Sequence, residues 1–172
     1  MQYDYRKTYE KNARFFIAHR WAKRALILTN YILTWLFIGI YPVFIAYGIC
    51  QKFSGFQLGG IIGLPLLCLI VVSILRFFIR RPRPFSANGA QITPFIQKDC
   101  DDNKSFPSRH LASTFVIASM FLPLLPCLSA LLYALGGLMI YTRFALGLHY
   151  PSDLICGALL GLSCGLPIFL FF

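Results

Sequence analysis

Two histidines and one aspartate in the second half of the chain have types and a spacing suited to chemistry on a phosphoryl group. His149 and Asp153 lie four residues apart, and Pro151 between them is a residue favoured at the first position of a helix. We therefore expect a helix to begin at Pro151, with Asp153 in its first turn. The aspartate could then accept a hydrogen bond from one imidazole nitrogen and leave the other as a nucleophile. His110 remains as the general acid for a leaving oxygen.

Arginines cluster around these three residues in the sequence. A guanidinium group presents donors in a planar fork that matches phosphate oxygens, and several converging arginines are typical of sites that stabilise a phosphoryl group in transit. Pro107 can open a second helix, which would leave the amides of the next three residues available to bind an anion. We predict that phosphate is bound by Arg76, Arg83, Ser108, Arg109 and Arg143.

Two other arginines, Arg80 and Arg81, could also bind phosphate, but a role in the topology of the chain is an equally good interpretation. Basic side chains near apolar segments often extend toward the membrane surface or set the topology of the chain. We assign no role to His19, which lies beside Trp21.

The composition indicates a membrane protein. Of the 172 residues, 58% are hydrophobic and 13% are charged, whereas soluble domains have about 25% charged residues. The net charge of +10 favours contact with anionic lipid headgroups or loops on the cytoplasmic side. Nucleic acid is not an expected partner, because no basic helix carries interleaved stacking aromatics. The six cysteines form no CxxC pair and no cluster with histidine, which argues against a disulfide framework or a zinc site.

The apolar segments predict an all-α integral membrane helical bundle with about five transmembrane helices. About twenty residues cross a bilayer, and the third segment is the shortest because Pro123 and Pro126 end it. Residues 1–24 carry seven basic residues among aromatics and predict an amphipathic surface helix with its apolar side on the membrane; a disordered basic tail is the alternative. Residues 25–172 would form the transmembrane catalytic domain, and no cleavable signal peptide is evident. The five segments are roughly 25–50, 57–79, 110–125, 128–148 and 154–172.

With five spans, the candidate chemical residues share one face of the membrane. The amino-terminal segment, the 80–109 loop and the 143–153 connection would all lie on that face. Every lysine and arginine except Lys52 would be there too.

The candidate residues fall into three clusters along the chain, at residues 76–84, 107–110 and 142–153. These three clusters resemble the signature of the type-2 phosphatidic acid phosphatase superfamily, the membrane lipid phosphate phosphatases related to vanadium haloperoxidases. That signature is Lys-x6-Arg-Pro, then Pro-Ser-x-His, then Ser-Arg-x5-His-x3-Asp. Order and spacing match over roughly residues 57–172, with arginine in place of lysine at 76 and threonine in place of serine at 142. Family members commonly have six spans. The matching residues here are Arg76-x6-Arg83-Pro84, Pro107-Ser108-Arg109-His110 and Thr142-Arg143-x5-His149-x3-Asp153.

This resemblance implies a mechanism that agrees with the residue types. His149 would attack phosphorus to form a phosphohistidine, Asp153 would orient it, and His110 would protonate the leaving oxygen before water hydrolyses the intermediate. The family needs no metal or other cofactor. We read the adjacent acids Asp101 and Asp102 as solvated rather than as a Mg²⁺ site.

The resemblance implies a lipid phosphate or diphosphate substrate and does not identify the tail. We rank undecaprenyl diphosphate first and phosphatidylglycerol phosphate second, with lipid A phosphatase and phosphatidic acid phosphatase activities open. A non-catalytic headgroup-binding membrane protein would use the same arginines without needing His149 or His110.

The expected location is a bacterial plasma (inner) membrane. The positive-inside rule places the basic face in the cytoplasm, whereas the resemblance places the site outside. We expect an extracytoplasmic site, because several arginines serve phosphate rather than topology. The sequence leaves the oligomeric state open.

Overall fold

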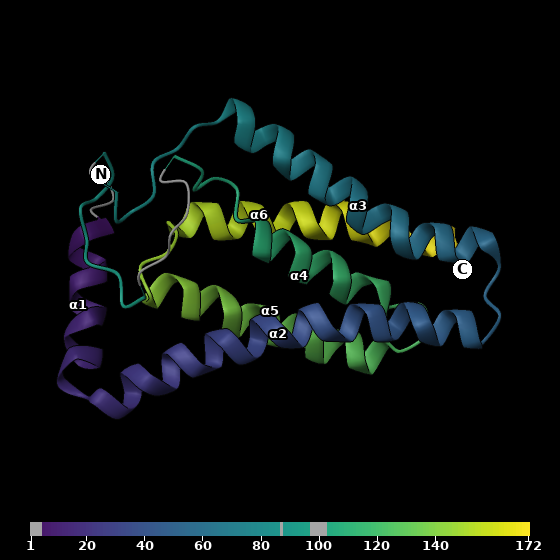
Figure 1. The fold of residues 1–172 in the computed structure, drawn as a ribbon, viewed down its shortest axis with the longest axis horizontal. Coiled ribbons are helices and arrows are strands. Elements are labelled where there is room, and N and C mark those ends of the chain that lie inside the picture. Colours follow the sequence, from purple (N-terminus) through teal and green to yellow (C-terminus); the bar gives the residue numbers. More distant parts are fainter. Residues whose placement is uncertain (1–4, 87, 97–102) are drawn as a thin grey trace.

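The computed structural model describes residues 5–86, 88–96 and 103–172, and these residues form helices joined by loops and turns. This confirms the predicted all-α class (Figure 1). In chain order the elements are α1 (Tyr5–Ala18), α2 (Arg20–Cys50), α3 (Gly55–Phe78), α4 (Arg109–Met120), α5 (Pro126–Ala145), α6 (Pro151–Gly165) and the short 3₁₀ helix η1 (Leu166–Leu170).

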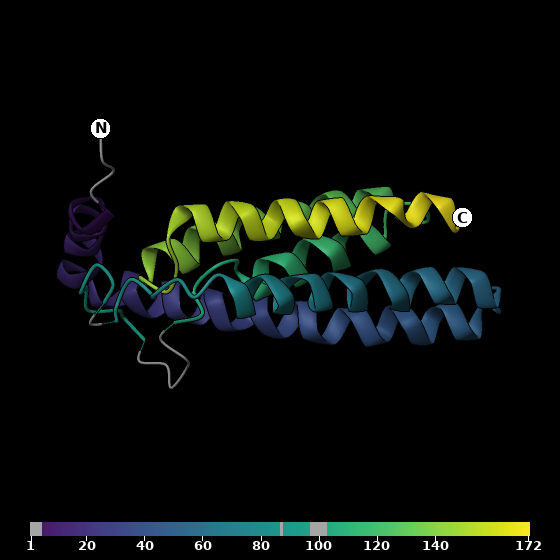
Figure 2. The same ribbon diagram turned by 90° about the horizontal axis from the view of Figure 1, so that it is seen from above.

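Four long helices surround a short central one. In Figures 1 and 2, α2, α3, α5 and α6 run alongside one another, and α1 lies across one end of the bundle. Helix α4 contacts all four of the long helices, and eight of its 12 residues are buried. The start of α4 is therefore held by the bundle from several sides.

Four segments are long and apolar enough to cross a membrane: α2, α3, α5, and α6 continued through η1 to Leu170. Large apolar side chains such as Trp35, Val43, Leu66 and Ile70 are exposed on α2 and α3. Exposed apolar surface of this kind matches the hydrocarbon of a bilayer. The chain is an integral membrane protein.

The fifth predicted span is the exception. Helix α4 has 12 residues, which gives roughly 18 Å at 1.5 Å per residue against about 30 Å of hydrocarbon. It ends at Met120 and gives way to a turn before α5 begins at Pro126. Prolines 123 and 126 cannot donate the backbone hydrogen bonds that would continue the helix. The turn stops short of the end reached by α2 and α3 (Figure 1).

Helices α4 and α6 pack closely because glycines face α4. A Cβ atom on Gly157 would lie 2.6 Å from the Ser108 carbonyl oxygen, and one on Gly161 would lie 2.4 Å from the Ala112 carbonyl oxygen. Small residues allow such backbone contact between membrane helices. The contact places the first turn of α4 beside the first turn of α6.

The amino-terminal helix is shorter than predicted and faces the protein. Helix α1 ends at Ala18, and residues 20–24 already belong to α2, because His19 adopts an extended conformation between them. The apolar stripe of α1 packs on the loop that contains Ile92 and Phe95 and on Phe144 and Tyr150, rather than only on the bilayer. The buried residues of this stripe are Tyr5, Tyr9, Ala13 and Phe16.

Candidate active site

The predicted chemical residues gather at one end of the bundle. The ends of α3 and α5, the starts of α4 and α6, and the loops between them meet there, next to α1 (Figure 1). The α2–α3 connection, which carries Lys52, lies at the opposite end. The directions of the helices therefore bring the three sequence clusters to the same end of the bundle, as expected.

A tight turn after α5 places His149. Gly147 has a φ of +75°, a conformation that residues with a Cβ rarely adopt. The turn is closed by the Leu148 amide, which donates to the Arg143 carbonyl at 3.1 Å. Helix α6 then begins at Pro151 with Asp153 in its first turn. The sequence prediction for this segment is confirmed.

The hydrogen bond on His149 differs from the predicted one. Its Nδ1 atom lies 3.1 Å from the Ser105 carbonyl oxygen and 3.8 Å from Asp153 Oδ2. The second distance is too long for a hydrogen bond. Because a carbonyl oxygen can only accept, Nδ1 carries the proton and Nε2 keeps its lone pair. The expected tautomer is present, but a backbone carbonyl fixes it.

Both oxygens of the Asp153 carboxylate are occupied by other donors. Oδ1 accepts from Arg81 Nη1 at 2.7 Å, and Oδ2 accepts from Ser105 Oγ at 2.5 Å and from the Tyr150 amide at 3.1 Å. This explains why the carboxylate does not bond directly to His149. Sequence reasoning left Arg81 undecided and missed Ser105. The available signal was its position two residues before the Pro107–His110 motif.

His149 is neutral at physiological pH. Burial lowers the pKa of His149 to about 4, and the nearby charges of Arg83 and Arg143 lower it as well, whereas Asp153 opposes the change. The side chain is 2% exposed. A neutral imidazole with a bare Nε2 is the form that can attack phosphorus.

Arg143 is a buried cation without a negative partner in the described part of the chain. It is 1% exposed, its Nη2 donates to Thr34 Oγ1 at 3.2 Å, and its Nε has no hydrogen-bond partner there. A buried charge is costly unless an opposite charge compensates it. The arrangement therefore suits a bound anion, and Thr34 on α2 is a neighbour that the sequence did not reveal.

Two other predicted phosphate ligands are also buried. Arg83 donates to the Leu148 carbonyl oxygen at 3.4 Å, next to His149. Ser108 is fully buried, and its hydroxyl has no hydrogen-bond partner among the described residues. An unsatisfied buried hydroxyl is costly, and a phosphate oxygen would satisfy it.

Arg76 is buried at the last turn of α3 and donates from Nη2 to the Lys104 carbonyl oxygen. With Arg80 and Lys104 it lines a cavity of about 290 Å³. This hydrogen bond thus goes to the loop residue that precedes Ser105.

The start of α4 differs from the prediction. Ser108 is the residue before the helix, which begins at Arg109, so Pro107 is not the first helical residue. The Ser108 amide, predicted to be available for an anion, donates to the Asp153 carbonyl oxygen at 2.9 Å. Close packing on Gly157 brings these two backbones together. An anion at this helix end would therefore meet the amides from Arg109 onward.

A cavity of about 230 Å³ begins at Arg109 and His110 and follows α4 into the bundle. Along α4 the lining residues are spaced so that they share one face of the helix, and the lining becomes apolar with distance from His110. Thr34, which bonds Arg143, also lines it. The remaining residues are Phe37, Ile38, Ser113, Thr114, Ile117 and Met139.

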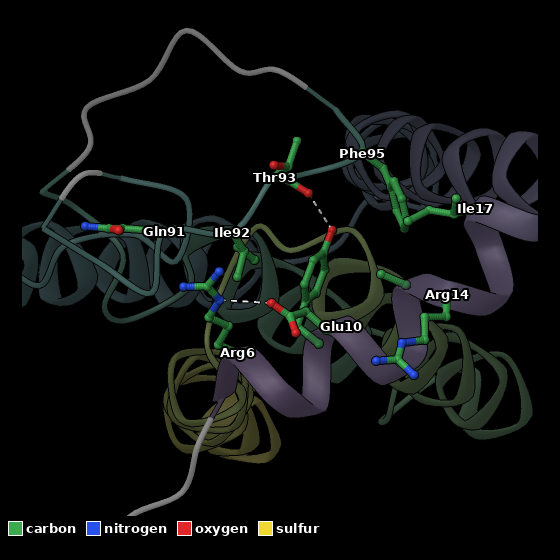
Figure 3. A pocket seen from close by; sticks show the side chains of 10 residues that line it. Arg6, Glu10, Arg14, Ile17, Gln91, Ile92, Thr93 and Phe95 are labelled. Carbon is green, nitrogen blue, oxygen red and sulfur yellow. Dashed lines mark hydrogen bonds and ion pairs between the residues drawn. The ribbon is translucent and has the colours of Figure 1, made fainter.

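A second pocket, of about 340 Å³, lies between α1 and residues 91–95 and contains none of the predicted site residues (Figure 3). Its wall carries an ion pair between Arg6 Nε and Glu10 Oε1 at 2.9 Å. Tyr9 Oη donates to the Thr93 carbonyl oxygen at 2.8 Å. The pocket carries both signs of charge, unlike the surroundings of Arg143.

The described residues contain no group of three His, Cys, Asp or Glu side chains that could hold a metal ion. Asp101 and Asp102, the acids we considered from the sequence, lie outside those residues, as does Cys100. The other five cysteines form no disulfide among the described residues.

Comparison with known proteins matches most of the chain to one family. A family model for the PAP2 superfamily matches residues 56–172. Lipid A 4'-phosphatase from Bacteroides thetaiotaomicron is 33% identical over 93 residues, which are 52% of this chain and 41% of that protein. The chain thus spans less than half the length of that relative.

A solved structure has the same fold. The crystal structure of Aquifex aeolicus LpxE matches with a TM-score of 0.66 and 24% sequence identity, over 83% of this chain and 84% of that one. At this identity, the likeness bears on the fold alone.

Proposed function

The chain belongs to the PAP2 superfamily, and we propose that it is a membrane lipid phosphatase that acts through a phosphohistidine on His149. One observation carries this proposal. The buried imidazole donates from Nδ1 to the Ser105 carbonyl, which leaves Nε2 as a neutral nucleophile close to the buried Arg83 and Arg143. A protein that only binds headgroups needs the arginines but has no use for a histidine held in one tautomer.

The reaction would proceed in two displacements at phosphorus. In the first, His149 Nε2 forms a bond to phosphorus while the ester P–O bond breaks, and protonated His110 gives its proton to the departing oxygen. In the second, water attacks phosphorus, neutral His110 takes a proton from the water, and the P–N bond breaks. Arg83, Arg143 and the Ser108 hydroxyl would stabilise the charge on the phosphoryl oxygens in both steps.

The cavity along α4 supports a lipid as the substrate. It joins the polar residues Arg109 and His110 to apolar side chains from α2, α4 and α5. A phosphorylated headgroup at the polar end would place the beginning of an apolar tail among Phe37, Ile38 and Ile117. We propose that the tail enters from the bilayer along this path.

We propose a phosphomonoester of lipid A as the first candidate substrate. The relative that aligns over half of this chain is named lipid A 4'-phosphatase. This replaces the ranking from the sequence motif, which put undecaprenyl diphosphate first, because the motif recognises a phosphate and not the lipid that carries it.

The test is phosphate release by the full-length protein purified in detergent with EDTA. Lipid A, undecaprenyl diphosphate, phosphatidylglycerol phosphate and phosphatidic acid would be assayed in parallel. We expect release from lipid A to exceed the others, and His149→Ala to abolish it while retaining lipid binding. His19→Ala is the matched control and should turn over normally. Preference for another lipid would replace the substrate, and turnover by His149→Ala would overturn the mechanism.

We further propose that the protein lies in a bacterial plasma membrane with the site on the extracytoplasmic side. The burial of Arg83 and Arg143 supports this proposal. Arginines buried in the site are explained by phosphate binding, so they need not be counted among the charges that orient the chain in the membrane. The basic residues of α1 and the start of α2 share that end and oppose the assignment under the positive-inside rule.

A further inference from the structure

Ser105 contacts both members of the His149–Asp153 pair. Its carbonyl oxygen accepts from His149 Nδ1 at 3.1 Å, and its hydroxyl donates to Asp153 Oδ2 at 2.5 Å. Its own amide donates to the Arg81 carbonyl oxygen at 3.0 Å. Ser105 is fully buried. This one residue therefore links the histidine, the aspartate and the segment that carries Arg81.

The side chain of Arg81 completes the same network. Its Nη1 atom lies 2.7 Å from Asp153 Oδ1 and 2.7 Å from Ser152 Oγ. Its guanidinium carbon lies 4.3 Å from the centre of the Tyr150 ring. Because the Asp153 side chain is fully buried and that of Arg81 is 35% exposed, the arginine supplies the charge that makes a buried carboxylate tolerable.

We propose that Ser105 and Arg81 are positioning residues, and that Asp153 orients His149 through Ser105 instead of by a direct hydrogen bond. The inference rests on the proposed role of His149 as the nucleophile. Asp153 and the Arg81 backbone hold Ser105 from two sides, so its carbonyl keeps Nδ1 protonated and Nε2 aimed at the substrate. If the hydrogen bond between Ser105 and Asp153 is lost, His149 Nε2 is held less firmly in the position for attack. This loss should slow the chemical step more than it weakens substrate binding.

The first test compares two fully buried serines. Ser105→Ala removes the hydrogen bond to Asp153 and keeps the carbonyl, and we expect kcat to fall by about 10- to 100-fold, as for the loss of a hydrogen bond to a charged group. KM should change little, and Ser105→Thr, which restores the hydroxyl, should recover part of the rate. Ser129→Ala removes a buried hydroxyl bonded to the Ala118 carbonyl oxygen near the other end of α5 and should leave turnover unchanged.

A double-mutant cycle tests whether Ser105 acts through Asp153. We expect Ser105→Ala combined with Asp153→Ala to be no slower than Asp153→Ala alone, because the hydroxyl then has no carboxylate to hold. The inference would be overturned if the rate losses of the two single variants multiplied in the double variant, or if Ser105→Ala had a normal kcat.

Arg81 is tested by chemical rescue, since its guanidinium is partly exposed. Arg81→Ala should lose turnover, and guanidinium ion added at millimolar concentration should restore part of it. Arg20→Ala, which removes an exposed arginine at the start of α2, should keep its activity and show no such gain. Absence of rescue in Arg81→Ala would overturn the role of its side chain.

A measurement that needs no turnover separates this inference from the proposed function. The chain has three histidines, so ¹⁵N NMR signals of the His149 ring can be assigned by difference with His149→Ala. We expect the Nδ1-protonated tautomer in the native protein and a mixture in Ser105→Ala. If the native protein hydrolyses none of the lipids but shows this change, the proposed function fails and the positioning role stands. An unchanged tautomer in Ser105→Ala would overturn the positioning role.

Discussion

At the scale of single residues, the candidate site combines a neutral imidazole, the proposed nucleophile, with buried positive charge. Burial lowers the pKa of His149, and the nearby charges of Arg83 and Arg143 lower it as well. The same cations that would stabilise a phosphoryl group thus help to keep the attacking nitrogen unprotonated. In the proposed mechanism, nucleophile activation and phosphate binding are two consequences of one arrangement of charge.

The lowered pKa of His149 predicts activity in mildly acidic solution. Protonation would remove the Nε2 lone pair, and the pKa of His149 lies near 4 instead of its ordinary 6.5. The neutral form is therefore retained as the pH falls through 6.5 and is lost only as it approaches 4. The acid limb of the pH profile of kcat/KM, which reports the free enzyme, should lie near 4.

The measurement must be corrected for the substrate, because the second ionisation of a phosphate monoester has a pKa of about 6. A corrected acid limb near 6.5 would mean that the imidazole is solvated in the free enzyme, contrary to the buried position that we describe.

At the scale of elements, the site depends on how closely α4 approaches α6. The Ser108 amide reaches the Asp153 carbonyl oxygen because Gly157 and Gly161 leave room for the α4 backbone. Helix α4 need not cross the bilayer for this purpose. Its contribution is a buried helix that begins with Arg109 and His110 at the end of the bundle where α6 also begins.

Two glycine substitutions test this packing. Gly161→Ala would place a Cβ 2.4 Å from the Ala112 carbonyl oxygen, whereas Gly137→Ala on α5 meets nothing within 4 Å. We expect Gly161→Ala to lower the free energy of unfolding by about 1–3 kcal/mol, as overpacking does. Gly137→Ala should be neutral or stabilising by up to about 1 kcal/mol, because alanine favours helices. Unfolding in detergent would measure both, and equal effects would contradict the packing.

At the scale of the whole molecule, one end holds the candidate site residues, and α1 lies across that end (Figure 2). Tyr5 of α1 donates to the His149 carbonyl oxygen at 3.4 Å, and its ring contacts the Tyr150 ring at 4.9 Å between centroids. The amino-terminal helix is therefore part of the surroundings of the site, although the family model matches only from residue 56.

The proposed orientation predicts which end of the bundle is accessible from outside the cell. Cys50 is exposed at the end of α2 opposite the site, and Asn103 is exposed beside the site. In a cysteine-free background, a membrane-impermeant maleimide should label Asn103→Cys in intact cells. A variant that keeps Cys50 alone should be labelled only after lysis. The reverse pattern would place the site in the cytoplasm.

The sequence by itself determined the class of the molecule and predicted candidate site residues that the structure brings to one end of the bundle. In a bilayer, a long apolar segment satisfies its own backbone hydrogen-bonding groups when it forms a helix. The all-α membrane bundle therefore followed from the length and composition of these segments. Pro151 and the four-residue spacing of His149 and Asp153 correctly predicted the start of α6. These features depend on neighbours in the chain, which a sequence displays directly.

Only the tertiary structure decided the contacts between distant segments. Nothing local indicates that the Ser105 carbonyl would replace Asp153 as the partner of His149, or that Arg81 would pair with Asp153, 72 positions away. The number of spanning helices differs from the prediction because α4 has 12 residues and is buried among the other helices instead of crossing the bilayer. Hydrophobic periodicity reports which side of a helix avoids water, but not whether lipid or protein covers it.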